Sequence, residues 1–406
     1  TISSLIQLEY NAFEAACVPV ATLTLRNYLL DLPGEYIKLS DFTGAENQPI
    51  KTIEAIKNPR SNYRYTASSK FEKIPGFPVA YWVRDRVRDI FENNPCLSEV
   101  SEPKVGLQTS NNNRFLRLWC EVEINKIGFD FSSIDEAKQS GLKWFPYNKG
   151  GDFRKWYGNN EYIVNWKNDG AEIKEWVVNN SNDAKTKHWS RRIFNTEFYF
   201  KQCATWSRIS SSSFGVRYSP SGFIFDNAGC SIFINDKDLK YLTSFLCSRL
   251  AFEFLEILNP TITFQVGDIG KLPIIFSENS EIKTLVDTIA DECILISRRD
   301  WDSFETSWDF QLHPFLQHRT DGRISSAFNS WKTFTESQFN QLKSNEEELN
   351  RLFIEIYGLQ DEMTPEVEDR DITIRKADLE RDIKSFISYS VGCMMGRYSL
   401  DSPGLT

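Results

Sequence analysis

The chain opens with two short apolar runs that predict β-strands. Residues 20–25 read VATLTL and combine apolar with β-branched side chains, and residues 36–39 read YIKL. Between them, the DLPG run at 31–34 is typical of a turn. The pattern therefore predicts a hairpin. Because one hairpin cannot form a domain alone, we expect residues 1–60 to be the end of an α/β domain whose other strands precede the chain.

The pattern of residue types changes across residues 61–276. Short runs of aromatic and β-branched residues alternate there with Asn, Gly, Ser and Pro, which predicts short strands joined by irregular loops. Residues 238–258 interrupt this pattern with leucines at helical spacing, and Pro260 would end that helix. We expect an α+β domain here. The predicted strands lie at 115–119, 162–164, 193–194 and 223–225.

Residues 277–406 have the 3.6-residue periodicity of helices. One apolar face runs over 282–296, and another helix is predicted over 379–394. Between them, Thr335 and Gln338 have the spacing of a capping box, which predicts that a helix begins there. Gly358 is predicted to end this helix. The predicted fold class is α+β. It comprises edge strands of an α/β domain, a central α+β domain and a helical C-terminal domain.

Composition narrows the function. The 406 residues include 47 Lys or Arg and 56 Asp or Glu, so the net charge of −9 excludes a generally basic nucleic-acid binder. No run of about 18 apolar residues predicts a membrane span. The eight cysteines are scattered without a C-x-x-C pair, which disfavours zinc sites and disulfides and fits a cytoplasmic protein. Because the chain begins at Thr1 and its first methionine is Met363, we expect it to be the C-terminal part of a longer polypeptide.

Positive charge gathers in residues 141–220. This window holds 13 Lys or Arg against 7 Asp or Glu, together with six of the 11 tryptophans. Basic residues interleaved with aromatics suit a phosphate backbone with bases stacked nearby, whereas a solvated basic face over a Trp-rich core is the alternative. The predicted DNA-binding residues are Lys143, Lys149, Arg154, Lys155, Trp156, Lys185, Lys187, His188, Arg191, Arg192, Lys201, Arg208 and Arg217.

No self-contained active site is visible. The chain has neither a phosphate-binding loop of the G-x-x-x-x-G-K-[ST] type nor a G-x-S-x-G elbow. His313 and His318 lie five residues apart, which is not the spacing of a helical zinc pair, so structural roles are favoured for both. We predict no catalytic, cofactor-binding or metal-binding residue in this chain.

Several blocks of distinctive sequence together span nearly the whole chain. They are FEKIPGFPVAYW at 71–82, GLQT at 106–109, NRFLR at 113–117 with Trp119, KWFPYNKGGDFRKWYGN at 143–159, NPTI at 259–262, FQVGDI at 264–269, LPI at 272–274, YGLQDE at 357–362 and DLERDIKSF at 378–386. These blocks resemble the BREX phage-exclusion adenine-specific DNA methyltransferases of the PglX type. In one place the chain departs from the pattern, because Ser110-Asn111 stands where the family usually has Gly-Asp.

The resemblance implies methyl transfer from S-adenosyl-L-methionine to adenine in double-stranded DNA, together with other phage-defence proteins as partners. Such enzymes carry an Asn-Pro-Pro-aromatic catalytic motif and a Gly-containing cofactor loop. Here the three Asn-Pro pairs are followed by Arg60, Cys96 and Thr261, so no catalytic residue carries over and the cofactor site is expected upstream. The resemblance assigns 1–60 to the end of the methyltransferase domain, 61–276 to target recognition and 277–406 to a helical domain.

Two other functions remain open at this point. One is a stand-alone DNA-specificity subunit that borrows a catalytic partner, although the expected strand remnant before Asp31 argues against it, because a separate subunit would not start within a domain. The other is a protein-interaction scaffold of a defence complex, in which the Trp-rich basic face would bind an acidic protein. An in-frame Asn-Pro-Pro-aromatic motif directly upstream of Thr1 would favour the methyltransferase.

Overall fold

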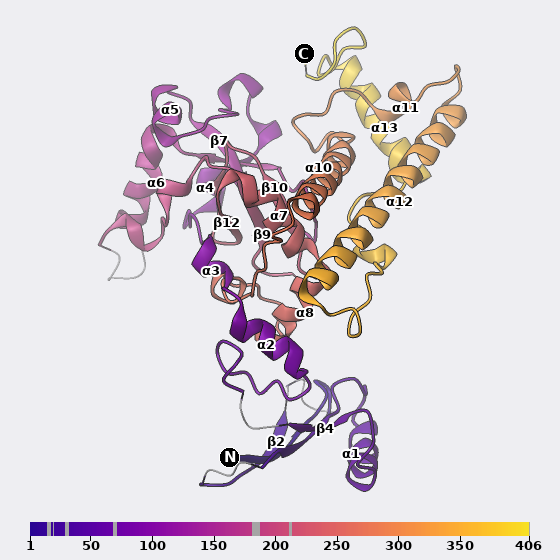
Figure 1. Ribbon diagram of the computed structural model, residues 1–406. Coiled ribbons are helices and arrows are strands. Elements are labelled where there is room, and N and C mark those ends of the chain that lie inside the picture. Colours follow the sequence, from indigo (N-terminus) through magenta and orange to yellow (C-terminus); the bar gives the residue numbers. More distant parts are fainter. Residues whose placement is uncertain are drawn as a thin grey trace. The chain divides into compact units, whose positions relative to one another are not determined.

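The computed structural model has two compact units, Thr1–Asn94 and Pro95–Thr406 (Figure 1). The division therefore falls after Asn94 rather than near residue 60, because the strand Arg64–Ala67 pairs within the first sheet. Both units mix helices and strands, which confirms the predicted α+β class at this level. The structure describes residues 1–13, 18, 20–28, 32–67, 71–180, 187–210 and 213–405.

The first unit contains a four-stranded sheet in the order β2-β1-β3-β4. The two strands predicted from the sequence are present, but the hairpin between them is wrong. The strand at residues 2–7 lies between them, antiparallel to one and parallel to the other. Apolar and polar residues do not alternate cleanly in its sequence, ISSLIQ, so the periodicity of the sequence did not predict this strand. The elements are β1 (Ile2–Gln7), β2 (Ala21–Leu25), β3 (Gly34–Lys38), α1 (Asn47–Lys57), β4 (Arg64–Ala67) and α2 (Asp85–Asn93).

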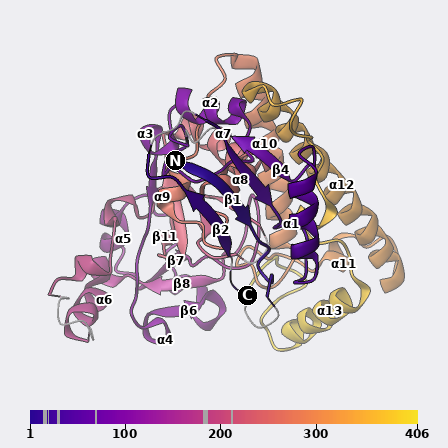
Figure 2. The same ribbon diagram turned by 90° about the horizontal axis from the view of Figure 1, so that it is seen from below.

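Both faces of this sheet are partly covered, because successive side chains of a strand point to opposite faces. On one face Ile37 packs with Ala55 of α1, which lies beside the strands in Figure 2. On the other face Tyr36 stacks on Tyr81, with ring centroids 4.7 Å apart, and meets the edge of Phe71. The segment after β4 is thus part of the first unit's core.

The second unit contains two further four-stranded sheets, in the orders β10-β9-β12-β5 and β11-β7-β8-β6. All pairs are antiparallel except β11 with β7, which is parallel. The predicted strand at 193–194 did not form. The strands are β5 (Glu102–Lys104), β6 (Leu116–Leu118), β7 (Trp144–Asn148), β8 (Tyr162–Asn165), β9 (Cys203–Ser207), β10 (Val216–Ser219), β11 (Ile224–Phe225) and β12 (Gly229–Phe233).

Helices pack against both sheets of the second unit. The predicted helix over 238–258 is two helices, because Ser248 is extended (φ −74°, ψ 154°) and its hydroxyl caps the second one. The predicted capping box at Thr335 is wrong: Thr335 lies inside a helix that begins at Ile324. The helices are α3 (Leu97–Val100), α4 (Asn112–Phe115), α5 (Ile134–Gln139), α6 (Lys167–Asn179), α7 (Asp236–Cys247), α8 (Arg249–Leu258), α9 (Val266–Ile269), α10 (Ser280–Asp302), α11 (Pro314–Gln317), α12 (Ile324–Tyr357) and α13 (Leu379–Met394).

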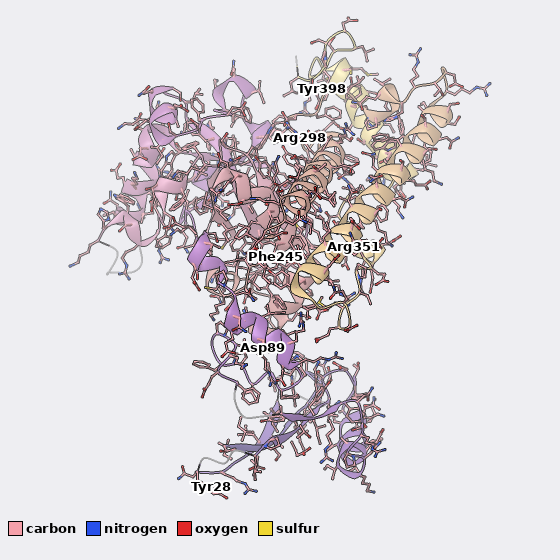
Figure 3. The ribbon with its side chains drawn as sticks, viewed as in Figure 1. Tyr28, Asp89, Phe245, Arg298, Arg351 and Tyr398 are labelled. Atoms are coloured by element: carbon pink, nitrogen blue, oxygen red, sulfur yellow. The ribbon has the colours of Figure 1, made fainter. Side chains whose placement is uncertain are left out.

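The helical tail belongs to the same compact unit as the two sheets. Helix α7 packs on β9 and β10, and α10 and α12 lie beside it (Figure 1). Phe245 of α7 is fully buried in this interior, whereas Arg351 reaches the surface of α12 (Figure 3). Gly358 ends α12 in the left-handed conformation (φ +65°), as the sequence predicts. In the described part of the chain, no helix is long and apolar enough to cross a bilayer.

Candidate nucleic-acid interface

The structure divides the predicted DNA-binding residues into a buried group and a group that reaches the surface. Four of them, Arg154, Lys155, Trp156 and Arg217, are buried in the second unit. Lys185 lies outside the described residues. The residues with exposed side chains are Lys143, Lys187, His188, Arg191 and Lys201, and those of intermediate exposure are Lys149, Arg192 and Arg208.

Arg154 is engaged inside the protein. Its Nη2 lies 2.6 Å from Oδ2 of Asp300 in α10, and its Nε donates to the Tyr157 carbonyl at 2.6 Å. Arg375 contacts the same Asp300 carboxylate at 3.3 Å. Burial alone would raise the pKa of Asp300, but the two guanidinium groups lower it below its ordinary value. Arg154 therefore fixes the sheet region to α10.

Lys155 and Trp156 share one acceptor in α12. Nζ of Lys155 lies 2.6 Å from Oε2 of Glu346, and Nε1 of Trp156 donates to Oε1 of the same carboxylate at 2.8 Å. Burial alone would lower the pKa of Lys155, but Glu346 raises it above its ordinary value, so the lysine is charged. The prediction that Lys155 and Trp156 contact DNA is wrong, because Nζ of Lys155 and Nε1 of Trp156 both face the buried carboxylate of Glu346.

Arg217 on β10 is also an interior residue. Burial, with a smaller repulsion from Arg154, lowers its pKa to about 10. Its Nη1 finds no hydrogen-bond partner within the described residues. The prediction that Arg217 contacts DNA is wrong, because this residue is buried and only 3% exposed.

Three of the exposed basic residues, Lys187, His188 and Arg191, lie in or beside a short turn that follows α6 in the chain. His188 begins this turn, because its Nδ1 accepts the backbone N–H of Ser190 at 3.3 Å. Trp189 is partly buried under the Lys174 ammonium, which lies 4.6 Å from its ring centroid. The aromatic anchor holds the backbone on the domain surface and leaves Lys187 and Arg191 exposed.

Some exposed or partly exposed basic residues are held by neighbours. Nζ of Lys149 lies 2.8 Å from Oδ2 of Asp226, so its charge is already compensated. Lys201 and Lys143 lie over aromatic rings, 5.0 Å from the Phe198 centroid and 5.4 Å from the Trp144 centroid respectively. Nη1 of the Arg208 side chain lies 3.4 Å from Oδ1 of Asn227.

Sequence reasoning missed a polar loop next to this turn. Gln108 bonds to Arg192 twice: its backbone N–H donates to the Arg192 carbonyl at 2.7 Å, and its side-chain Oε1 accepts from Nη1 at 3.0 Å. Asn112 and Asn113 follow with exposed side chains. Asparagine and glutamine side chains are among the groups that read base edges. The run of three asparagines at 111–113 was the available signal, but the contact of Gln108 with Arg192 depends on the tertiary structure.

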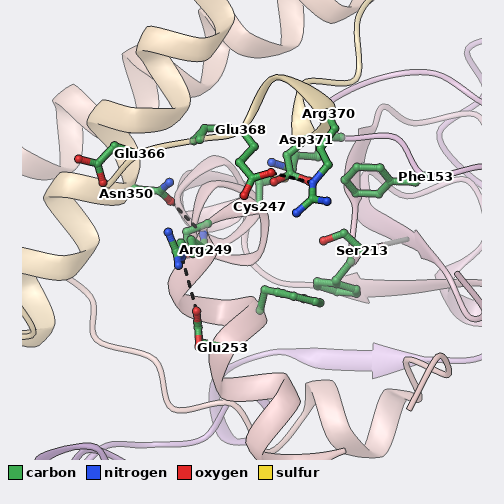
Figure 4. Close-up of a pocket in the computed structure, with 15 residues that line it drawn as sticks. Phe153, Ser213, Cys247, Arg249, Glu253, Asn350, Glu366, Glu368, Arg370 and Asp371 are labelled. Atoms are coloured by element: carbon green, nitrogen blue, oxygen red, sulfur yellow. Dashed lines mark hydrogen bonds and ion pairs between the residues drawn. The ribbon is translucent and has the colours of Figure 1, made fainter. Parts of the chain in front are cut away.

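A cavity of about 600 Å³ lies elsewhere in this unit, between α8 and the segment 366–371 (Figure 4). Phe153, Phe214 and Phe252 contribute its apolar lining. Its two arginines are paired with carboxylates, Arg249 with Glu253 at 3.5 Å and Arg370 with Glu368 at 2.8 Å. Glu366 and Asp371 add further negative charge. A phosphate backbone would be repelled here, so this cavity is not part of the basic surface.

The histidines and cysteines do not form a metal centre within the described ranges. No group of three or more His, Cys, Asp or Glu there could hold a metal ion. His313 is buried, and its Nδ1 accepts from the Phe315 backbone N–H at 3.2 Å, which is the structural role expected from the sequence. The described cysteines are free thiols.

Comparison with known proteins identifies relatives. The chain is 42% identical over 379 residues to the adenine-specific methyltransferase PglX of Lacticaseibacillus casei (strain Zhang), a match that covers 92% of this chain and 31% of the relative. It is 34% identical over 369 residues to the adenine-specific methyltransferase BrxX of Escherichia coli O9:H4 (strain HS), covering 86% of this chain and 28% of the relative. The chain thus spans about a third of the relatives it matches, and the resemblance to the PglX type is confirmed. No known protein-family model matches it.

Two solved structures are similar at a lower level. One is the Type IIL restriction-modification enzyme MmeI in complex with DNA, with a TM-score of 0.49 and 12% identity, covering 96% of this chain and 46% of that one. The other is the type IIG restriction endonuclease BpuSI, with a TM-score of 0.29 and 11% identity, covering 88% and 44%.

Proposed function

We propose that this chain, which is homologous to the PglX and BrxX adenine-specific methyltransferases over about a third of their length, binds and reads double-stranded DNA for methyl transfer to adenine. An enzyme that modifies a base must extract it from the stack, and a separate surface must hold the duplex meanwhile. Phosphate contacts position such a protein, and contacts with base edges give it specificity. The proposed role of the chain is that second surface.

The observation that carries the proposal is the exposed basic turn in an otherwise acidic chain. Lys187, His188 and Arg191 reach the surface beside Arg192, within a window whose net charge is +6 in a chain of −9. Four residues of the predicted contact set are buried, whereas Lys187, His188 and Arg191 are exposed. Local positive charge would attract phosphates, and the acidic remainder would limit indiscriminate binding.

In the complete enzyme, different parts of the protein would bind the cofactor, recognise the DNA and dock other proteins. S-adenosyl-L-methionine and the catalytic motif would be held by a part of the protein outside these 406 residues. The sheets of Pro95–Thr406 would carry the recognition surface. The helices α10, α12 and α13 would support it and offer docking surfaces to other phage-defence proteins. The first unit would contribute edge strands to the methyltransferase domain.

Salt-dependent binding tests the proposal. Fluorescence anisotropy with a labelled duplex should show an affinity that falls steeply between 50 and 200 mM salt, by about a thousandfold if roughly six phosphates are neutralised. Lys187→Ala and Arg191→Ala should each lower the slope of log K against log salt by about 1, because each would remove one phosphate contact. Lys384→Ala on α13 is the control, since Lys384 is also exposed but lies in the helical tail.

The alternatives predict different results. A protein-interaction scaffold would show no salt-dependent affinity for DNA, and all three variants would behave alike. A stand-alone specificity subunit would bind DNA in the same way as the methyltransferase, but it would be encoded without an in-frame catalytic motif. An unchanged slope in Lys187→Ala and Arg191→Ala, with normal folding, would return both residues to the role of a solvated surface.

A further inference from the structure

We propose that Arg192, held in position by Gln108, reads a guanine in the recognised DNA sequence. This inference rests on the proposed function, because it identifies which side chain of the basic surface distinguishes bases. The other exposed basic residues would then contact phosphates. The argument depends on how the pair is fixed, which groups it leaves available, and how it differs from the neighbouring arginines.

The pair is fixed to the core on both sides. Gln108 follows Leu107, which is fully buried and whose N–H donates to the Phe225 carbonyl at 2.8 Å. Arg192 precedes Ile193, which is only 1% exposed. The two hydrogen bonds between Gln108 and Arg192, one from backbone and one from side chain, hold the guanidinium at a defined place. Base readout needs this positional precision, whereas contact with a phosphate tolerates a flexible chain.

The atoms that remain available are mostly hydrogen-bond donors. The side-chain oxygen of Gln108 accepts from Nη1 of Arg192, which leaves the Gln108 Nε2 group and the Nε and Nη2 groups of Arg192 without a bond to another described residue. In the major groove, guanine presents two adjacent acceptors, N7 and O6, whereas adenine presents one acceptor and one donor. The guanidinium of Arg192 carries donors only, so it matches guanine and meets the amino group of adenine unfavourably.

Neighbouring arginines are arranged differently. Nε and Nη2 of Arg114 both donate to Oε1 of Glu172, at 3.1 and 2.8 Å, so a carboxylate already occupies the side of the guanidinium that a guanine would require. Arg154 is occupied by Asp300 in the core. Arg192 instead contacts a neutral amide and keeps intermediate exposure. It combines a fixed position with a charge that no carboxylate of the described residues pairs with, next to the exposed turn.

The experiment uses the intact protein and its own recognition sequence, mapped as methylated adenines in genomic DNA. Binding is then measured for duplexes in which each base pair of that sequence is replaced in turn, and for duplexes with 7-deazaguanine at each guanine. The variants are Arg192→Lys, which keeps the charge but loses the planar fork, and Gln108→Ala, which releases the guanidinium. Arg191→Lys is the matched control, because it makes the same exchange one residue away.

For the wild type, replacing one G·C pair should weaken binding about 5- to 150-fold, and 7-deazaguanine at the same position should also weaken it, because N7 is lost. Arg192→Lys should bind the unmodified sequence less tightly but become indifferent to both changes at that position, with an unchanged salt slope. Gln108→Ala should lose part of the same discrimination. Arg191→Lys should keep it.

Two outcomes would overturn the inference. One is a recognition sequence without guanine in either strand. The other is full discrimination by folded Arg192→Lys and Gln108→Ala proteins at every position. Failure of the proposed function would look different, because the wild-type protein would then show no sequence-dependent affinity for DNA at all. Thermal unfolding of each variant separates a loss of readout from a loss of folding.

Discussion

The Nζ atom of Lys155 lies 2.6 Å from Oε2 of Glu346, although the two residues are 191 positions apart in the chain. Both side chains are less than 10% exposed. The pair connects the Gly-rich basic segment before β8 with the middle of α12, and Trp156 shares the same carboxylate. A segment that resembles a DNA-binding cluster in the sequence therefore stabilises the junction between sheets and helical tail.

We expect Glu346→Gln to destabilise the second unit by about 3–5 kcal/mol, because it leaves the Lys155 ammonium buried without a counter-charge. Denaturant unfolding followed by tryptophan fluorescence measures this. The double variant Lys155→Met with Glu346→Gln should recover much of the loss, since no buried charge remains and the amide oxygen can still accept from Trp156.

The control for that pair is Glu380→Ala, which removes the exposed partner of Lys384 on α13. An exposed pair of this kind contributes about 0–1 kcal/mol. If Glu346→Gln lowered the free energy of unfolding no more than Glu380→Ala does, the buried ion pair would not hold the helical tail to the sheets.

Gly106 should tolerate no side chain. A Cβ atom there would overlap the carbonyl oxygen of Phe225, and the adjacent Leu107 N–H is bonded to that same oxygen. We expect Gly106→Ala to cost about 1–3 kcal/mol or more, because backbone must move to relieve the contact. Gly267→Ala, where nothing lies within 4 Å of the added atom, should be neutral or slightly stabilising. Equal melting temperatures for the two variants would contradict the predicted close approach.

His313 should make stability depend on pH. Burial lowers its pKa to about 4, against an ordinary value of 6.5 in the unfolded chain. Between these values the unfolded state binds more protons, so the free energy of unfolding should fall as the pH drops from about 6.5 to about 4. The contribution of this residue is at most about 1.4 kcal/mol per pH unit. His313→Asn, which can still accept the Phe315 N–H, should show a shallower dependence in denaturant titrations at several pH values.

Recognition should transfer between relatives at residue 95 rather than at residues 61 and 276. Exchange of 61–276 alone would separate Arg154 and Lys155 from Asp300 and Glu346, whereas exchange of 95–406 keeps both pairs together. On the proposed function, the chimera exchanged at 95–406 should be stable and methylate the donor's sequence. Methylated adenines mapped by single-molecule sequencing check this, and an active chimera that keeps the recipient's site would refute it.

The 406-residue chain by itself should bind no S-adenosyl-L-methionine, because it contains neither an Asn-Pro-Pro-aromatic motif nor a Gly-containing cofactor loop. Isothermal titration calorimetry with the purified chain measures this directly. Stoichiometric heat of binding would show that the cofactor site uses residues of this chain.

The sequence by itself determined the elements whose signal is local. Apolar periodicity predicted α10 and α13, and Gly358 predicted the end of α12, because a left-handed residue there favours glycine. The family blocks predicted the relatives that sequence comparison confirms. Local sequence patterns predicted the wrong structure where the conformation of a break residue or pairing with another part of the chain determined the element. The extended Ser248 divides one apolar run into two helices, and β1 separates two strands that were expected to pair.

Only the tertiary structure decided which basic residues face solvent. Arg154 and Arg191 look alike in the sequence, since each stands in a cluster of basic and aromatic residues. One is buried because Asp300, far along the chain, supplies a counter-charge; the other lies in a turn whose aromatic anchor points inward. Counting charged residues along the sequence gives the sign of each charge, but it does not show which distant residue pairs with it in the fold. In a protein, that partner determines whether a charge can leave water.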